Sequence, residues 1–477
     1  MDKFISYYEK MNIVINNNIN NDHVAIIIEP RNHEYLISTI KQVMSKLGDT
    51  WNLQIYGSNM NEELIKQNIN GNFKFYNIGI DELEFENIYS LLLQNIEFWN
   101  SINEQHILMF QIESFIINNN YYIPEEYGFI GPPYKYGVTF NNEYIDCRSP
   151  VKNGFNLCGG FSYRKKDIMI ECINKVSYKD IIRYRKKHDL DISNFENTII
   201  LPEDCFFLNA MCILGYDIPR DITSCLKFCF NQNYNLSTNS INILESFGIN
   251  QLSQVSKINK TFIDNLCVHV LLTTIHSQIK FQYGSLLDEL PEQKMAVRYL
   301  TGNEKVLELG SNIGRNSVII GHILEDSSNF VTLESDPNTI KYLEHNKNIN
   351  NLNFHIEASA LSKKNLIQKD WLTYESDEIK DGFIKVNTIT VDELNKKYNI
   401  EFDTLVLDCE GAFYNILRDM PEILNNIKLI IMENDYQDIK LKNFIDDILI
   451  NHNFKVDYQQ RGGWGPCEDR FFEVWIK

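Results

Sequence analysis

The chain has 477 residues, too many for one compact core, so we expect two domains. Apolar residues make up 44% and aromatic residues 12% of the chain, which indicates a folded protein and argues against a disordered one. The net charge of −19 argues against broad electrostatic binding of nucleic acid or of an anionic membrane.

The cysteines and the amino terminus indicate the cellular compartment. The ten cysteines are scattered and form no C-x-x-C pair, which argues against a zinc site and for buried thiols in a reducing compartment. The amino terminus lacks the apolar core of a signal peptide, and no run reaches the roughly 18 apolar residues of a membrane span. We therefore expect a cytoplasmic protein without a membrane span. The Asn- and Ile-rich composition suits an AT-rich microbe or a large virus, and for a virus the location would be the host cytoplasm.

Apolar runs alternate with helical patterns in the first half of the chain. Strands are expected at 24–28, 51–56, 73–78 and 107–111, and helices at 33–47 and 88–99. This alternation of strands and helices predicts a mostly parallel sheet that is covered by helices on both faces.

The composition changes to Asn, Ser and Gln between residues 231 and 260, so the join between the domains is placed there. The predicted organisation is a first domain at 1–230, a linker with a connecting helix at 231–284, and a second domain at 285–477. Both domains are expected to be α/β.

The second half repeats the alternation and ends differently. Strands are expected at 305–309, 330–334, 353–357, 404–407, 429–433, 455–458 and 471–476, with helices at 315–324 and 337–346 and helical segments between the later strands. Two strands at the end of a doubly wound set predict a Rossmann-like sheet with antiparallel edge strands.

The most informative segment, 306–317, has the pattern of a strand, a glycine turn and the start of a helix. Gly310 and Gly314 let the backbone approach a ligand, and Glu334, which ends the next strand, is placed to accept hydrogen bonds from a ribose diol. The E-x-G-x-x-x-G spacing differs from the G-x-G-x-x-G of dinucleotide sites. It favours S-adenosylmethionine, which has no pyrophosphate, over an ordinary tight turn.

Acidic residues fall at the ends of five expected strands: Glu308, Glu334, Glu357, Asp408 and Glu433. Ligands of open α/β sheets bind outside the carboxyl ends of the strands, so these acids are expected around one site. Asp408 is the first choice for a base or substrate anchor, Glu410 the second and Glu433 the third, with a helix-capping role of Asp408 as the alternative. Carboxylates also suit magnesium.

Motifs over about 286–477 resemble those of the FkbM-type methyltransferases. These motifs are V-L-E-L-G-x-N-x-G, T-L-E-x-D-P, I-E-A-S-A-L-S, D-T-L-V-L-D-C-E-G-A and I-I-M-E. The resemblance implies a Rossmann-like class I domain that binds S-adenosylmethionine and methylates an oxygen, often on a sugar. By position it implies Glu308, Gly310, Asn312 and Gly314 at the methionine end, Glu334 at the ribose, Glu357 and Ser359 beside the adenine, and Asp408 and Glu410 near the methyl group.

Segments over about 24–212 resemble a glycosyltransferase-like family of unknown function. They are E-P-R, Q-I-E-S, Y-G-F-I-G-P-P, N-L-C-G-G-F-S-Y-R and P-E-D-C, in this order. The resemblance implies a GT-A-like fold and, by analogy, sugar transfer from a nucleotide sugar with Mg²⁺ or Mn²⁺. It implies Arg31 at the donor base or phosphate, Glu113 on the metal, Gly159 and Gly160 at the sugar, and Glu203 or Asp204 as the acceptor base or an acceptor-binding acid. The alternative interpretations are that Gly159 and Gly160 form a hairpin turn, and that Glu203 and Asp204 lie at a helix N-terminus, where acids are favourable.

The combined interpretation is a bifunctional enzyme that modifies a glycan or glycoconjugate. The second half would O-methylate a sugar hydroxyl, and the first half would add or hold that sugar. One alternative is a methyltransferase with a non-catalytic carbohydrate-binding module. Another is a methyltransferase that acts on a lipid, a polyketide or a protein. No nucleic acid partner is expected.

Overall fold

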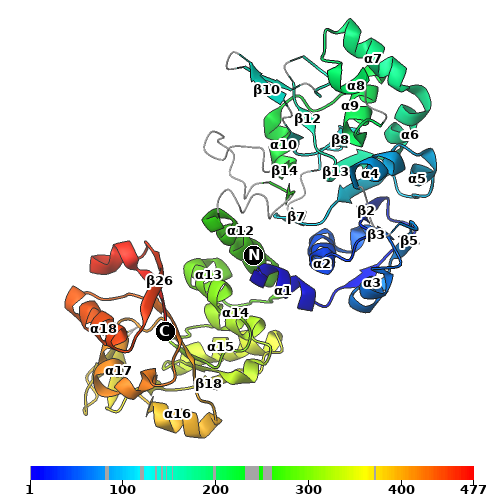
Figure 1. Cartoon of the computed structure of the whole chain (residues 1–477). Helices are drawn as coiled ribbons and strands as arrows, with labels where there is room; N and C mark the ends of the chain where they lie inside the picture. Colours follow the sequence, from blue (N-terminus) through cyan, green and yellow to red (C-terminus); the bar gives the residue numbers. More distant parts are fainter. Residues whose placement is uncertain are drawn as a thin grey trace. The chain divides into compact units, whose positions relative to one another are not determined.

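The computed structural model divides the chain into two compact units, Met1–Val270 and Leu271–Lys477 (Figure 1). It describes residues 2–80, 85–118, 123–134, 137–140, 143–146, 148–152, 154–196, 200–230, 246–250, 260–369 and 372–477. The division falls inside the segment 231–284 that we expected to join the domains, of which 231–245 and 251–259 lie outside the described residues.

The first unit is built on a six-stranded sheet in the order β5-β3-β2-β6-β13-β8. Its strands are β2 (His23–Ile28), β3 (Asn52–Gly57), β5 (Lys74–Asn77), β6 (His106–Phe110), β8 (Phe129–Ile130) and β13 (Phe161–Lys165). The strands β5, β3, β2 and β6 are parallel, as predicted, and β13 is antiparallel to both of its neighbours. The apolar run of β2 is buried almost throughout, which is typical of a central strand covered on both faces.

Helices and short strands complete the first unit (Figure 1). The helices are α1 (Asp2–Lys10), α2 (Leu36–Leu47), α3 (Glu62–Asn68), α4 (Phe85–Leu93), α5 (Ile96–Asn100), α6 (Lys166–Lys175), α7 (Tyr178–Lys187), α8 (Ser193–Glu196), α9 (Glu203–Leu214) and α10 (Ile222–Phe228), with a 3₁₀ turn at Gly48–Thr50. The short strands are β1 (Val14–Asn16), β4 (Asn70–Asn72), β7 (Phe115–Ile116), β9 (Pro133–Tyr134), β10 (Gly137–Phe140), β11 (Glu143–Asp146), β12 (Asn156–Leu157), β14 (Cys229–Phe230) and β15 (Gly248–Ile249). The helix α12 (Lys260–Gln278) spans the division between the units.

One predicted helix of the first half is wrong in its extent. The pattern over 88–99 predicted a single helix, but the chain forms α4 and α5 with a break between them. Asn95 caps the beginning of α5: its backbone is extended, and its side chain accepts a hydrogen bond from the Glu97 N–H at 3.0 Å.

The second unit contains a seven-stranded sheet in the order β18-β17-β16-β24-β25-β27-β26. Its strands are β16 (Val306–Leu309), β17 (Phe330–Leu333), β18 (His355–Glu357), β24 (Thr404–Leu407), β25 (Leu429–Glu433), β26 (Lys455–Gln460) and β27 (Phe472–Ile476). Only β27 is reversed: it is antiparallel to both β25 and β26, while the neighbouring pairs from β18 to β25 are parallel. The predicted antiparallel pairing of the last two strands is confirmed.

Helices cover both faces of this sheet, and the strands alternate between two cores. The helices are α13 (Leu290–Tyr299), α14 (Arg315–Ile323), α15 (Pro337–Ile349), α16 (Val391–Tyr398), α17 (Phe413–Asp419) and α18 (Ile439–Asn451), with 3₁₀ turns at Leu286–Glu289, Ser327–Asn329, Pro421–Leu424 and Gly465–Arg470. Val306 packs with side chains of α13 to α15, whereas Leu307 and Leu309 pack with side chains of α16 to α18. Because side chains alternate along a strand, Glu308 shares the face of Val306.

The segment between β18 and β24, for which helical segments were predicted, contains one helix, α16, and also strands that were not predicted. It forms β19 (Ala360–Leu361), β20 (Leu366–Lys369), β21 (Leu372–Glu375), β22 (Ile384–Val386) and β23 (Thr388–Ile389) before α16. Strands β20, β21 and β22 make a small antiparallel sheet. Within the described ranges, every helix is too short or too polar to cross a membrane.

Candidate functional site

The turn after β16 is shaped by a glycine that no other residue can replace without strain. Gly310 has φ +90°, and a Cβ there would lie 1.6 Å from the carbonyl oxygen of Asp408. The Gly310 N–H donates to the carbonyl oxygen of Leu333 at 3.1 Å. The ends of β16, β17 and β24 are thereby held close together, with open backbone facing the cavity above them.

The rest of the turn divides between ligand-facing and packing roles. Asn312 is in the left-handed region with φ +48°, and it lines the cavity. Gly314 has φ +90° where α14 begins, and a Cβ there would lie 2.5 Å from Leu343 Cδ1. Gly314 therefore lets α14 pack on α15, and it is not among the residues that line the cavity.

Glu334, at the end of β17, is held in place by the turn opposite. Its Oε2 accepts the Asn312 N–H at 2.9 Å, and its Oε1 accepts the Asp336 N–H at 2.8 Å. Burial raises the pKa of Glu334, and these backbone hydrogen bonds oppose the rise. Each carboxylate oxygen has a second lone pair, so Glu334 can still accept hydrogen bonds from a ligand.

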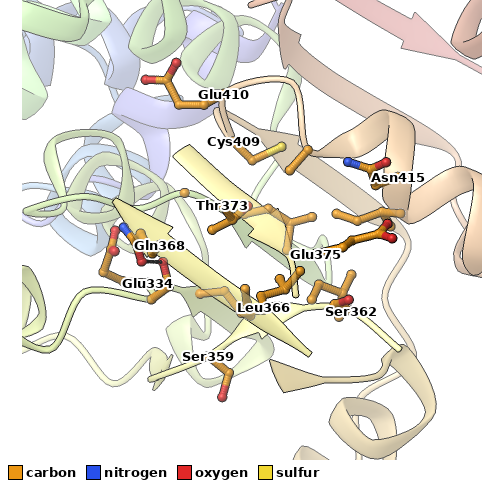
Figure 2. Close-up of a pocket in the computed structure, with 18 of the residues that line it drawn as sticks. Glu334, Ser359, Ser362, Leu366, Gln368, Thr373, Glu375, Cys409, Glu410 and Asn415 are labelled. Carbon is orange, nitrogen blue, oxygen red and sulfur yellow. Dashed lines mark hydrogen bonds between the residues drawn. The ribbon is translucent and has the colours of Figure 1, made fainter. Parts of the chain in front are cut away.

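The cavity lies outside the carboxyl ends of β16, β17 and β24, where an open α/β sheet binds its ligands. It holds about 1070 Å³ of empty space, part of it open to solvent. Its lining combines apolar residues such as Leu309, Leu361 and Met420 with hydrogen-bonding groups. In Figure 2, Glu334 lies close to Gln368, whereas Glu410 lies on a separate part of the lining, next to Cys409.

One wall of the cavity comes from β20 and β21, two strands that were not predicted from the sequence. Gln368 accepts a hydrogen bond from Ser335 Oγ at 2.8 Å, and Thr373 and Glu375 also line the cavity (Figure 2). The available signal was the run of β-branched and aromatic residues around Ile367 and Thr373, which favour strands.

Two acids that were expected to contact the cofactor lie elsewhere. Glu308 is 2% exposed and accepts hydrogen bonds from Ser317 Oγ at 2.5 Å and Thr332 Oγ1 at 2.6 Å. It faces a second, smaller hollow, because it points to the opposite side of the sheet from Leu309. Burial raises the pKa of Glu308 to about 7. Glu308 was expected to contact the methionine end of the cofactor. It lies beneath the turn instead and does not line the cavity.

Glu357 has a supporting position at the end of β18. Its carboxylate accepts hydrogen bonds from Lys397 Nζ at 2.6 Å, Tyr398 OH at 2.7 Å and Ser359 Oγ at 3.0 Å. Burial alone would raise the pKa of Glu357, but Lys397 and Tyr398 bring it below its usual value. Ser359 lines the cavity and Glu357 does not, so Glu357 orients Ser359 from behind.

The three catalytic candidates of the second unit occupy different positions. Asp408 lines both the cavity and the smaller hollow. Glu410 is exposed, has φ +50° and lines the cavity, while Glu433 lines the smaller hollow, which holds about 300 Å³. Burial raises the pKa of Asp408 and Glu433, and partial burial raises that of the more exposed Glu410; neighbouring carboxylates add to each rise.

In the first unit, Arg31 and Glu113 follow the carboxyl ends of β2 and β6, which are adjacent in the sheet. The guanidinium of Arg31 donates twice to the buried carboxylate of Glu29, from Nε and from NH2, each at 2.8 Å. Its side chain remains 45% exposed. Glu113 has φ +63°, a conformation that is uncommon for a residue other than glycine.

The glycines and acids farther along the first unit pack against one another. Glu203 binds both terminal nitrogens of Arg164, at 2.7 and 2.9 Å, and both side chains are buried. A Cβ on Gly159 would lie 1.8 Å from Glu203 Oε1, and one on Gly160 would lie 2.6 Å from Gln111 Oε1.

These contacts correct two expectations. Glu203 is a structural partner of Arg164 and is not a free base, and Gly159 makes room for Glu203 and not for a sugar. Asp204 stays the candidate acid, and burial, followed by Glu203, raises its pKa to about 7.

Comparisons with known proteins cover parts of the chain. A family model described as a protein of unknown function, DUF5672, matches residues 73–249. No curated protein sequence matches the chain.

Solved structures with partial similarity include three methyltransferases. A ribosomal protein L11 methylase from Lactobacillus delbrueckii subsp. bulgaricus has 11% identity and a TM-score of 0.28, and the match covers 41% of this chain and 81% of that one. An O-methyltransferase from Bacillus cereus in complex with SAH has 15% identity and a TM-score of 0.27, over 45% and 90% of the two chains. An rRNA methylase from Streptococcus thermophilus has 8% identity and a TM-score of 0.26, over 41% and 98%. Scores this low carry no argument about function.

Proposed function

We propose that the second unit is an S-adenosylmethionine-dependent methyltransferase. One observation carries the proposal: Glu334 is fixed by the Asn312 N–H at the rim of a cavity whose floor is the backbone of Gly310. A carboxylate at the end of the second strand and open backbone at the end of the first are what a nucleoside with a short polar tail requires.

In this proposal the ribose diol donates to Glu334, and the adenine lies between Ser359 and apolar residues such as Leu361. The sulfonium lies toward Asp408 and Glu410, which line the same cavity. In the turn, the N–H groups of Gly310 and Ser311 donate to the Leu333 carbonyl oxygen and that of Asn312 donates to Glu334, so they are not available to a pyrophosphate. A mononucleoside therefore fits better than a dinucleotide.

The reaction is an in-line displacement on the methyl carbon. The acceptor oxygen forms a bond to that carbon while the S–C bond breaks, and the electron pair of that bond stays on sulfur. The proton of the acceptor hydroxyl passes to a carboxylate, for which Asp408 is the first choice and Glu410 the second. Asp408 follows β24 and lines the cavity, which is why it is the first choice.

The acceptor is proposed to be a sugar hydroxyl of a glycan or glycoconjugate. The polar groups of Thr373, Glu375 and Asn415 on the cavity wall support a hydroxyl-rich acceptor (Figure 2). A polyketide, lipid or protein acceptor is the rival, and methyl transfer from labelled S-adenosylmethionine to panels of each class separates them.

Binding of the methyl donor is the direct test. Calorimetry with S-adenosylmethionine should show one site, and Glu334→Ala should weaken binding by about 1–3 kcal/mol, because the ribose diol loses a buried acceptor. Glu344→Ala is the matched control, since Glu344 is exposed on α15 and should leave the affinity unchanged. Wild-type protein that is folded and takes up no donor would contradict the proposal.

For the first unit we propose a nucleotide-sugar site at the carboxyl ends of β2 and β6. The observation that favours it is the strained backbone of Glu113, three residues after the end of β6, because such strain is retained most often where a function needs it. Arg31 would bind the donor, Glu113 its Mg²⁺ or Mn²⁺, Gly160 would lie near the sugar, and Asp204 would be the acceptor base.

Nucleotide release tests this second proposal. The protein is incubated with Mn²⁺ and a panel of nucleotide sugars, and release of the nucleotide by the wild type but not by Glu113→Ala supports it. Glycan binding without release from any donor favours the carbohydrate-binding module instead.

A further inference from the structure

Three carboxylates meet at the ends of two neighbouring strands of the second unit. Asp408 follows β24, and Glu433 and Asp435 come at the end of β25, which pairs with β24. One oxygen of each lies within 4.8 Å of the others. Ligand oxygens on opposite sides of a magnesium ion are about 4.2 Å apart, so small side-chain movements would let all three bind one cation.

The hollow beside this cluster contains two buried oxygens without donors. Among the described residues, neither Glu292 Oε2 nor Asn316 Oδ1 accepts a hydrogen bond. Glu292 is 9% exposed and Asn316 is 7% exposed, and both line the hollow together with Asp408 and Glu433. Buried oxygens without a donor are costly, so their presence in one hollow points to a missing electropositive partner.

Two basic side chains of this unit are already bound. Arg315 donates to Glu289 at 2.9 Å and to the Ser285 carbonyl at 3.1 Å. Lys442 lies 2.7 Å from Glu473. In the part of the chain that the structure describes, no salt bridge reaches Asp408, Glu433, Asp435 or Glu292.

We propose that a divalent cation, Mg²⁺ or Mn²⁺, binds between Asp408, Glu433 and Asp435, with Glu292 as a further ligand. The ligand set consists of hard oxygens, which these ions prefer, and it contains no nitrogen or sulfur of the kind that structural zinc sites use.

The site also gives the cation a role that rests on the proposed methyl transfer. Asp408 borders both the hollow and the donor cavity, so a cation on Asp408 would lie next to the acceptor. A hydroxyl bound to the cation has a lower pKa and loses its proton more readily. The expected substrate class is therefore a hydroxyl compound that supplies an oxygen to the metal.

Mn²⁺ binding to the full-length protein tests the site without any methyl donor. After removal of metals with EDTA, titration followed by electron paramagnetic resonance should show bound Mn²⁺. Glu433→Gln and Asp435→Asn should each weaken this binding at least 10-fold, and Glu292→Gln should weaken it less. Asp469→Asn is the control, because Asp469 is 93% exposed in the same terminal segment.

The first unit holds other groups that could bind Mn²⁺, among them His23, His106 and Glu125, so the assignment depends on the variants. Binding that survives Asp435→Asn and Glu433→Gln, or its absence from wild-type protein, overturns the site. Circular dichroism checks that each variant is folded. Calorimetry with S-adenosylmethionine in EDTA separates failure of the cation site from failure of the donor site.

Discussion

Both units place acids near the carboxyl ends of their strands, but the two units treat these acids differently. In the first unit Glu203 is bound by the buried Arg164, and Glu29 is bound by Arg31. In the second unit Asp408 and Glu433 have no basic partner among the described residues. Similar sequence patterns therefore lead to neutralised pairs in one unit and to a cluster of like charges in the other.

The difference depends on what packs opposite each acid, and not on which unit it belongs to. Glu473 on β27 is as buried as any acid of the chain, yet it is paired with Lys442. Met432 faces it across the ladder, and Glu433 comes one residue later beside Phe472. Glu473 and Glu433 are thus one position apart in the strand register, yet only Glu473 has a basic partner among the described residues.

Removal of a partner from a pair should cause the largest loss of stability. Arg164→Met should lower the free energy of unfolding of the first unit by about 3–5 kcal/mol, because it leaves Glu203 charged and buried without a partner. Chemical denaturation followed by intrinsic fluorescence measures the loss. The double variant Arg164→Met/Glu203→Leu should recover most of it, and a double variant as unstable as the single one would refute the role of the pair.

Paired and unpaired acids should respond to pH in opposite directions. The pKa of Glu308 is raised to about 7 in the folded state, so its contribution to stability is complete below about pH 4.5 and is lost as the pH rises toward 7. That contribution is about 3 kcal/mol, since the shift is about 2.5 pKa units. Burial alone would raise the pKa of Glu473, but Lys442 holds it below its usual value, so its contribution is lost as the pH falls.

Glu308→Gln should therefore flatten the fall in melting temperature between pH 5 and pH 7, measured by calorimetry. Glu473→Gln should leave that fall unchanged. An unaltered pH profile in Glu308→Gln would show that the raised pKa does not contribute to stability.

Removal of one charge from the cluster should stabilise the metal-free protein. In EDTA, Glu433→Gln should raise the free energy of unfolding by about 1–2 kcal/mol, the equivalent of about one pKa unit. Thermal melts in EDTA and in excess Mg²⁺ measure the effect, and Mg²⁺ should stabilise the wild type more than the variant. A variant that is less stable than wild type in EDTA would indicate that Glu433 is paired.

The half-exposed Arg31–Glu29 pair of the first unit should affect stability less than the fully buried Arg164–Glu203 pair. Arg31→Ala should lower the free energy of unfolding by about 1–3 kcal/mol, because Glu29 is 1% exposed and loses its partner, although the Arg31 side chain is 45% exposed. If Arg31 contacts the donor, the same variant weakens nucleotide-sugar binding, as measured by calorimetry. Lys152→Ala is the control, because the Lys152–Asp189 pair is also exposed.

The sequence was sufficient for the main strands and for the turn at Gly310. The strands β2 and β24 are recognisable because each is a continuous apolar run that becomes buried. The turn at Gly310 is recognisable because glycine, which has no Cβ, readily adopts a positive φ. The β20–β21 wall was missed because its short strands show no strong alternation of apolar and polar residues in the sequence.

The sequence by itself determined which residues end the strands, and thus that Glu334 and Asp408 belong to one edge of a sheet. Only the tertiary structure decided which of the acids are free. The group that faces an acid can be a basic side chain, a backbone N–H or another carboxylate, and it often comes from a distant segment of the chain. Arg164 faces Glu203 in this way, and Glu292 faces Glu433. Electrostatic interactions act through space, so their sign cannot be read from the neighbours in sequence.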